Sequence, residues 1–235
     1  MLVDEETKIL VRRLLGLDVH PEMRCPFVSA ESHQCQKTAD PKGIHAANCK
    51  YNHNYRHDAT RDACVLYCQN NNILVKKEVH VRQNLNEEAP ALERSTRDNR
   101  RGDRPGDVVF SVFHGGRVVN GYVDFSVVDE QQPSNSFYVG ATAGLARVTQ
   151  AEQFKIAKYA HLGFGPSATF IPAVASTSGA WGNKALEAFK FMAYHVNLTS
   201  RTLELKKLRV LMATTVMKLV AGDIKQVMTY REYAS

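Results

Sequence analysis

Asp107-Val108-Val109-Phe110-Ser111-Val112-Phe113 is an apolar run rich in β-branched residues, and the turn sequence His114-Gly115-Gly116-Arg117 follows it directly. A second apolar run, from residue 122 to 128, comes next and contains Asp124. Two such runs on either side of a glycine-containing turn predict a β-hairpin. Asp107 opens the first strand and Asp124 lies inside the second, so the hairpin would bring two carboxylates side by side.

Two carboxylates on adjacent strands can hold one divalent cation, such as Mg²⁺ or Mn²⁺. Lys155 and Lys158 follow in a helical pattern at residues 150–161. An ammonium group near such a cation can orient a water for attack on phosphate, which is the chemistry of a metal-dependent nuclease. Acids at strand ends also commonly cap turns or face solvent, and helical lysines commonly face solvent. The pattern alone leaves both interpretations open.

The composition narrows the class of protein. The chain has 235 residues, 44% of them apolar, which suffices for one large domain or a domain with small appendages. A net charge of +6 suits an anionic partner such as nucleic acid. No run of about eighteen apolar residues predicts a membrane span, and the acidic N-terminus lacks a secretion signal. We therefore expect an intracellular protein without a membrane partner.

A pattern of cysteine and histidine upstream predicts a structural zinc site. Cys35-x9-His45-x3-Cys49 has the ligand types and loop lengths of a small zinc knot, and residues 40–43 form a turn sequence between the ligands. Three ligands leave a fourth to be found. His33 is the first choice because it lies two residues before Cys35, and the alternatives are Cys25, then His53 or His57.

The two remaining cysteines and a basic segment have simpler interpretations. Cys64 and Cys68 are one helical turn apart and are expected in the core. The polar segment at residues 84–106 is basic, and its guanidinium groups suit phosphate contacts; a solvated connection is the alternative. The candidate nucleic-acid-binding residues are Arg97, Arg100, Arg101 and Arg104.

Hydrophobic periodicity predicts the remaining elements. Pro172 within an apolar strand indicates a bulge or an edge strand. In the last helix, Leu208, Leu211, Thr215 and Leu219 mark the expected apolar stripe. Helices are expected at residues 7–17, 57–70, 150–161, 183–196 and 203–220, and further strands at 73–81 and 168–174. This order predicts a mixed α/β fold.

Several short motifs occur in an order that supports a metal-dependent nuclease. They are Arg13-Leu14-Leu15-Gly16-Leu17, the segment from Asp40 to Cys49, Arg56-His57-Asp58, Arg104-Pro105-Gly106-Asp107-Val108, Val123-Asp124-Phe125-Ser126-Val127-Val128 and Lys155-Ile156-Ala157-Lys158-Tyr159. Together they resemble the region that follows the reverse transcriptase in non-LTR retrotransposon polyproteins of the R2 kind. There, a CCHC zinc knuckle precedes an Arg-His-Asn helix and a restriction-endonuclease-like domain. The likeness covers nearly the whole chain.

The resemblance implies a PD-(D/E)XK nuclease core, in which a mixed central sheet carries the acids and helices cover it. Asp107 and Asp124 would bind Mg²⁺ or Mn²⁺ for hydrolysis of DNA. Lys155 or Lys158 would replace the lysine that normally follows the second acid by two residues, where this chain has Ser126. The implied organisation is an N-terminal helix and zinc-knuckle region at 1–55, a restriction-endonuclease-like core at 56–182 and a C-terminal helical extension at 183–235.

Two departures from that family suggest a second function. His33 stands where the knuckle pattern places a cysteine, and the chain contains no reverse transcriptase. A nuclease captured by its host can persist as a catalytically inactive part of a ribonucleoprotein or other large assembly, for example a mitochondrial ribosome, binding protein, DNA or RNA. An active element product would act in the nucleus, and a captured one in an organelle. Convergence of the acids with a lysine would favour cutting, whereas acids held in salt bridges would argue against it.

Overall fold

The computed structural model describes residues 4–29, 32–79, 106–114, 116–129, 141–160, 164, 168–196 and 200–234. The predicted phosphate-binding residues Arg97, Arg100, Arg101 and Arg104 lie outside the described residues. The helices are α1 (Glu5–Leu14), α2 (Ile44–Asn48), α3 (Lys50–Asn70), α5 (Ala141–Tyr159), α6 (Asn183–Val196) and α7 (Arg201–Ala234). The strands are β1 (Met23–Arg24), β2 (Thr38–Ala39), β3 (Leu74–Val79), β4 (Gly106–His114), β5 (Arg117–Val128) and β6 (Ala168–Ser176).

The central sheet is mixed, with the strand order β3-β4-β5-β6. The first three strands are antiparallel neighbours, whereas β5 and β6 run parallel. A parallel pair needs a crossover connection, and α5 lies in it. The mixed α/β class is therefore confirmed.

The predicted hairpin is formed by β4 and β5. His114 pairs with Arg117 at the turn, and Val108 pairs with Val123 near the other end. One further step in the same antiparallel register sets Asp107 opposite Asp124. On the far side of β5, Asp124 pairs with Pro172 of β6, which is an edge strand of the described sheet. The edge position predicted from this proline is confirmed, because an edge strand tolerates the missing N–H.

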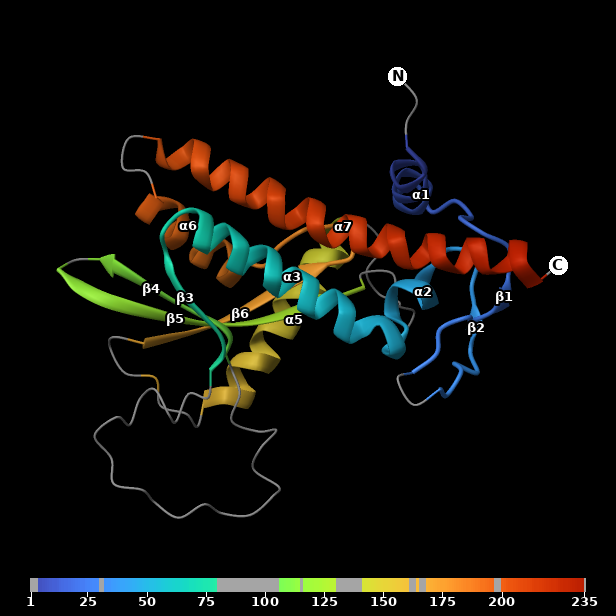
Figure 1. The fold of residues 1–235 in the computed structure, drawn as a ribbon, viewed down its shortest axis with the longest axis horizontal. Coiled ribbons are helices and arrows are strands. Elements are labelled where there is room, and N and C mark those ends of the chain that lie inside the picture. Colours follow the sequence, from blue (N-terminus) through green and yellow to red (C-terminus); the bar gives the residue numbers. More distant parts are fainter. Residues whose placement is uncertain are drawn as a thin grey trace, which may run out of the picture.

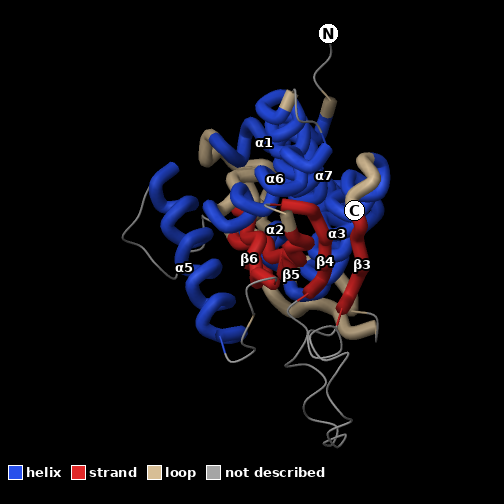
Figure 2. Tube along the Cα trace, turned by 90° about the vertical axis from the view of Figure 1, so that its left-hand side faces the viewer, coloured by secondary structure: helices blue, strands red, loops and turns tan. Residues whose placement is uncertain are grey.

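The two faces of the sheet are covered by different helices. Phe110 and Phe125 point into the main core, which also contains buried residues of α3, α6 and α7. Val109 and Tyr122 alternate to the opposite face and form a smaller cluster with Ala168. Figure 2 shows α5 on one side of the strands, with α3 and α7 on the other. The acids of the hairpin therefore lie within a helix–sheet–helix sandwich.

Helix α7 organises the whole molecule. It contacts α1, α2, α3 and α6 and runs from the sheet end of the fold to the N-terminal region (Figure 1). The prediction of its apolar stripe is wrong apart from Leu208. Leu211 is partly exposed, and the buried residues recur three or four positions apart. The fully buried stripe consists of Leu208, Met212, Val216, Val220, Ile224 and Val227. Since the stripe continues past Gly222, the helix ends far beyond the predicted residue 220.

Four predicted helix starts also differ from the structure. The start of α7 differs by two residues, at Arg201 rather than at 203. Helix α3 begins at Lys50 rather than at 57, and α5 begins at Ala141 rather than at 150. In α3, a tertiary contact stabilises the polar N-terminal part of the helix. The buried Arg56 side chain donates to Asp223 of α7 and to the Ala46 carbonyl. Helix α1 starts at Glu5, where Asp4 caps it by accepting a hydrogen bond from the Thr7 N–H at 2.8 Å.

Two further expectations concern burial and membranes. Cys64 and Cys68 are both fully buried in the main core, as predicted. Among the helices that the structure describes, none has the length and apolarity needed to cross a membrane.

Candidate metal centres

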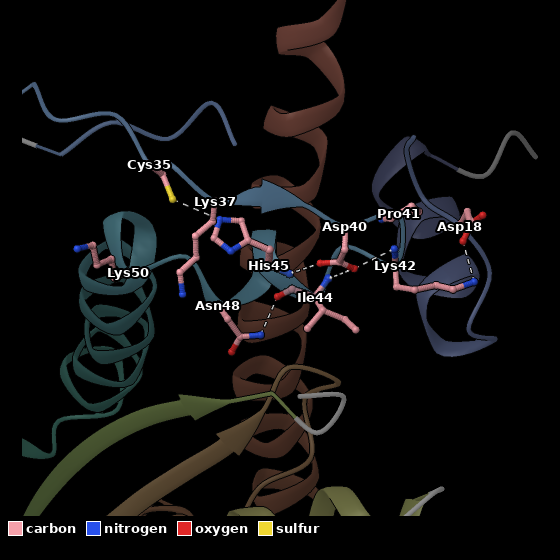
Figure 3. Close-up of a pocket in the computed structure, with 10 residues that line it drawn as sticks. All are labelled: Asp18, Cys35, Lys37, Asp40, Pro41, Lys42, Ile44, His45, Asn48 and Lys50. Atoms are coloured by element: carbon pink, nitrogen blue, oxygen red, sulfur yellow. Dashed lines mark hydrogen bonds and ion pairs between the residues drawn. The ribbon is translucent and has the colours of Figure 1, made fainter. Parts of the chain in front are cut away.

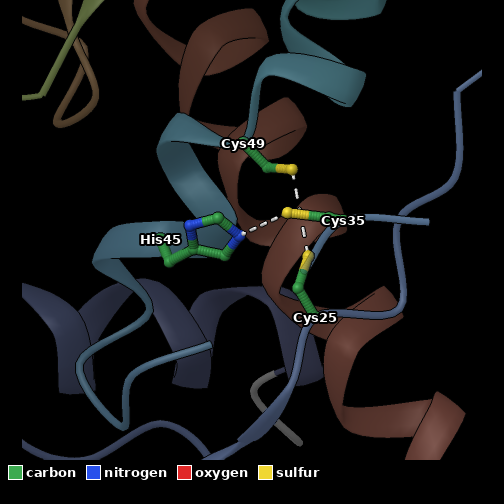
Figure 4. Close-up of side chains that lie close together, drawn as sticks. All are labelled: Cys25, Cys35, His45 and Cys49. Atoms are coloured by element: carbon green, nitrogen blue, oxygen red, sulfur yellow. Dashed lines mark hydrogen bonds between the residues drawn. The ribbon is translucent and has the colours of Figure 1, made fainter. Parts of the chain in front are cut away.

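Three cysteines and one histidine meet at the junction of the N-terminal region with α2 and α3. Their ligand atoms all lie within 4.8 Å of one another. Cys25 follows β1, Cys35 precedes β2, His45 lies in α2 and Cys49 joins α2 to α3 (Figure 4). The set is largely buried. Cys₃His is one of the ligand sets of structural zinc sites.

Two interatomic distances fit a tetrahedral zinc ion. Sγ of Cys25 lies 3.8 Å from Sγ of Cys49, and Sγ of Cys35 lies 3.5 Å from Nε2 of His45. Tetrahedral bonds of about 2.3 Å to sulfur and about 2.0 Å to nitrogen place two sulfurs about 3.8 Å apart and a sulfur and a nitrogen about 3.5 Å apart. The four residues therefore fit zinc without rearrangement of these pairs.

Short-range structure brings the four ligands together. Pairing of β1 with β2 aligns the two chain segments, and the Cys25 N–H donates to the Lys37 carbonyl at 3.0 Å. Cys35 N–H likewise donates to the Phe27 carbonyl at 2.9 Å. The Asp40 carboxylate accepts hydrogen bonds from the first N–H groups of α2, including that of His45 at 2.6 Å. The turn predicted around Asp40 thus orients the histidine.

The fourth member of this group is Cys25, the second choice, and not His33. His33 is exposed, and its carbonyl accepts a hydrogen bond from the Ser29 N–H in the turn before Cys35. Proximity along the chain favoured His33, whereas strand pairing brings Cys25 across to Cys35. The side chain of His53 lies outside the described residues, and His57 belongs to a second group.

The protonation of the ligands depends on their burial. Burial raises the pKa of Cys25 to about 12 and also raises the pKa of Cys49. Burial lowers the pKa of His45, which favours the neutral imidazole that binds metal. Thiolates at this site therefore need a cation to stabilise them, and metal binding would release protons.

A cavity of about 580 Å³ lies beside this cluster (Figure 3). Cys35 and His45 line it together with three lysines, Lys37, Lys42 and Lys50. Lys42 forms an ion pair with Asp18 at 2.7 Å and donates to the Gly16 carbonyl at 2.7 Å.

A second group of ligands lies at the hairpin, where His57, Asp107 and Asp124 place their ligand atoms within 4.8 Å of one another. Nε2 of His57 lies 2.8 Å from Oδ2 of Asp107. That same oxygen accepts a hydrogen bond from the Phe125 N–H at 2.6 Å. Nζ of Lys155 lies 2.7 Å from Oδ2 of Asp124. The group thus combines two adjacent strands with side chains from α3 and α5.

The two carboxyls of this group have opposite pKa shifts. Burial raises the pKa of Asp124 to about 6, although the Lys155 ammonium opposes the shift. Burial also acts to raise the pKa of Asp107, but His57, the Phe125 N–H and the Lys155 charge together outweigh it, and the net pKa is lowered. The hydrogen bond to Asp107 raises the pKa of His57 in turn. A cation at this site would relieve the cost of ionising Asp124.

Of the two candidate lysines, Lys155 reaches the acids. Lys158 is exposed, and its Nζ lies 4.8 Å from the ring centroid of Tyr159. Tyr159 is itself buried and packs edge-on against Phe170. At 3.6 residues per turn, a step of three residues leaves the two side chains about 60° apart around the helix axis, which is consistent with only Lys155 contacting the acids.

His57 was not predicted to belong to this group. The sequence suggested His57 only as one of the alternative fourth ligands of the zinc site. The available signal was its place in Arg56-His57-Asp58, directly before the helix pattern, but only the tertiary structure sets it against Asp107.

Comparisons with protein-family models, with curated proteins and with solved structures found no significant match to this chain. The residues and their geometry are therefore the basis on which a function can be inferred.

Proposed function

We propose that this protein is a restriction-endonuclease-like enzyme of retrotransposon origin that hydrolyses DNA phosphodiesters with a divalent metal. The observation that supports the proposal most is the convergence of Asp107, Asp124 and Lys155. Carboxylate oxygens of the two acids lie within 4.8 Å of each other, and Nζ of Lys155 lies 2.7 Å from Oδ2 of Asp124. A mixed sheet that carries both acids, with helices on both faces, agrees with the core that the resemblance implies.

Each residue has a distinct role in the proposed reaction. Asp107 and Asp124 hold Mg²⁺ or Mn²⁺, which supplies Lewis-acid polarisation of the phosphate when bound. Once a cation shares the charge of Asp124, the Lys155 ammonium is available to orient a water or to stabilise negative charge on the phosphate. The basic residues Arg97, Arg100, Arg101 and Arg104 contact the DNA backbone in this proposal.

Zinc is the proposed structural cofactor, held by Cys25, Cys35, His45 and Cys49. Metal analysis of the purified protein is expected to find one zinc per chain, and Cys49→Ser is expected to lose it. His33→Ala is the matched control, because His33 is exposed, lies two residues from Cys35 in the sequence and is not a member of the cluster. Loss of zinc in His33→Ala with retention in Cys25→Ser would reverse the assignment of the fourth ligand.

One observation favours a second function from a different class. Asp124 pairs with Lys155 and Asp107 pairs with His57, so each acid already has a basic partner. Acids with basic partners do not need a metal to balance their charge, which would suit a nuclease fold retained for binding within a ribonucleoprotein or another large assembly. The proposal of cutting requires that a divalent cation competes with Lys155 for Asp124.

Nicking of supercoiled plasmid DNA in Mg²⁺ or Mn²⁺ tests the proposal. The wild type is expected to nick, and the Asp107→Ala/Asp124→Ala double variant is not. Lys155→Ala is expected to slow nicking by about 10² to 10⁴, as loss of a positioned proton donor or acceptor does. Lys158→Ala, one helical turn away on α5, serves as the control and should retain most activity. Equal nicking by the wild type and the double variant, or none by either, would favour the non-catalytic assembly component.

A further inference from the structure

We propose that His57 is a third metal ligand and that the group His57, Asp107 and Asp124 selects a first-row transition cation such as Mn²⁺ over Mg²⁺. The inference rests on the metal-holding role proposed for the two acids, but it does not require that the protein cuts DNA. A histidine ligand changes the expected cation of this site from Mg²⁺ to a first-row transition metal ion.

The geometry of the histidine supports direct coordination. The three ligand atoms come from three separate elements, α3, β4 and β5, and lie within 4.8 Å of one another. Octahedral bonds of about 2.1 Å place neighbouring ligand atoms about 3.0 Å apart. The 2.8 Å between Nε2 of His57 and Oδ2 of Asp107 is close to this value. A shift of a few tenths of an ångström would therefore admit a cation between them.

The other ring nitrogen of His57 has the partner that metal-binding histidines commonly have. Nδ1 lies 3.1 Å from Oδ1 of Asp58, and that carboxylate is also paired with Arg61. A carboxylate that accepts a hydrogen bond from Nδ1–H leaves Nε2 as the nitrogen that can bind a metal. Nε2 itself lies at hydrogen-bond distance from the Asp107 carboxylate, so a cation would displace the proton held between them.

The composition of the site decides which cation it favours. Mg²⁺ prefers oxygen ligands and keeps its waters, whereas Mn²⁺ and later first-row ions bind imidazole more readily. The side chains of Asp124, Asp107 and His57 are 10%, 16% and 24% exposed, so the site is sheltered but open to solvent. Three protein ligands leave coordination positions for water or for a phosphate oxygen.

Manganese binding to the zinc-loaded protein, followed by electron paramagnetic resonance, tests the inference. The wild type is expected to bind one Mn²⁺ at least about ten times more tightly than Mg²⁺. His57→Gln is expected to weaken Mn²⁺ binding by about 10 to 100 times, and Asp58→Ala by about 10 times. Mg²⁺ binding should change little in both. His33→Gln, an exposed histidine outside either group, is the control and should bind as the wild type does.

A second measurement needs no variant and therefore does not depend on whether His57→Gln folds. Pulsed paramagnetic resonance of the bound Mn²⁺ in the wild type is expected to show coupling to a directly bound ¹⁴N. Absence of that coupling, equal affinities for Mn²⁺ and Mg²⁺, or equal losses of both in His57→Gln would overturn the inference.

The outcomes separate this inference from the proposed function. Nitrogen-coupled Mn²⁺ without any nicking would leave the metal site standing and remove the nuclease. Nicking that depends on the two acids, without nitrogen coupling, would leave the nuclease standing and return His57 to a structural role.

Discussion

Asp124 is the residue at which burial, charge and chemistry compete most directly. Its carboxyl is nearly enclosed between β5 and α5, and burial raises its pKa to about 6. Lys155 lowers this pKa and Asp107 raises it, so the protonation of Asp124 reports on both neighbours. A carboxyl with such a pKa is partly protonated under mildly acidic conditions, when it would bind a cation poorly.

The pKa of Asp124 can be measured directly. Carbon NMR of labelled aspartate is expected to show Asp124 titrating near pH 6 in the metal-free protein. Lys155→Met should raise that pKa by removing the ammonium, and Asp107→Asn should lower it by removing a like charge. Because the folded pKa lies above the unfolded value of 3.8, this carboxyl favours the folded state below about pH 4. That contribution is lost as the pH rises through 6. A pKa near 4 in the wild type would contradict the burial argument.

A second buried acid, Asp129, connects three parts of the chain. Arg13 of α1 donates to its Oδ1 at 2.8 Å, and the Thr177 hydroxyl donates to the same oxygen at 3.1 Å. Asn48, next to the proposed zinc ligand Cys49, donates to its other oxygen. Asp129 thus ties the N-terminal region to the end of β5, five residues beyond Asp124.

We expect Asp129→Ala to destabilise the protein by about 3 to 5 kcal/mol, because it leaves the buried Arg13 without its carboxylate. Chemical denaturation followed by circular dichroism measures this difference. Asp62→Ala is the matched control, since Asp62 pairs with Arg61 and Lys77 at the surface. Its removal should cost at most about 1 kcal/mol. Similar losses in the two variants would show that burial does not set the strength of the Asp129 network.

At the scale of elements, the hairpin depends on a glycine. Gly121 of β5 pairs directly with Phe110 of β4, and the phenyl ring occupies the space where a Cβ would lie. Phe110 is one of the largest fully buried side chains. The close packing that positions the two acids therefore requires a residue without a side chain at 121.

Two glycine substitutions are predicted to change stability in opposite directions. Gly121→Ala should destabilise the protein by about 1 to 3 kcal/mol, because the new methyl overpacks against Phe110. Gly222→Ala in α7 should stabilise it by up to about 1 kcal/mol, because the added Cβ meets open space and alanine favours the helix. Thermal unfolding measures both. Stabilisation by Gly121→Ala would show that the ring moves away at little cost.

At the scale of the whole molecule, the Cys₃His cluster and the sheet share one hydrophobic core. The main cluster of buried apolar residues includes Cys25, Cys35 and Cys49 as well as residues of β4, β5 and α7. Helix α2 packs on α7, which also packs on α3 and α6. Disruption of the cluster should therefore lower the stability of the whole fold.

Removal of the proposed zinc is predicted to lower the midpoint of thermal unfolding for the entire protein. A loss of about 3 kcal/mol would lower it by about 6 to 12 °C for a chain of this size. Calorimetry before and after chelation, with Cys49→Ser as a metal-free reference, measures the shift. An unchanged midpoint after complete release of zinc would show that packing alone maintains the N-terminal region.

Much of the fold follows from local patterns. The hairpin, the edge strand with Pro172 and the helix Asn183–Val196 were predicted because periodicity and turn residues act over a few positions. The start of α3 and the end of α7 were not, because Arg56 and Ile224 stabilise those parts of the helices through contacts with distant segments. Local propensity does not contain that information.

The candidate sites divide along the same line. The pairing of the two hairpin acids could be predicted from local sequence, because neighbouring strands joined by a short turn have a register set by that turn. The sequence also indicated Cys35, His45 and Cys49 by spacing. Three features could be seen only in the folded chain. Cys25 rather than His33 completes the Cys₃His cluster, Lys155 rather than Lys158 contacts Asp124, and His57 lies beside Asp107. Each of these choices depends on which distant backbone segments pack together, and the free energy of that packing is a property of the whole core.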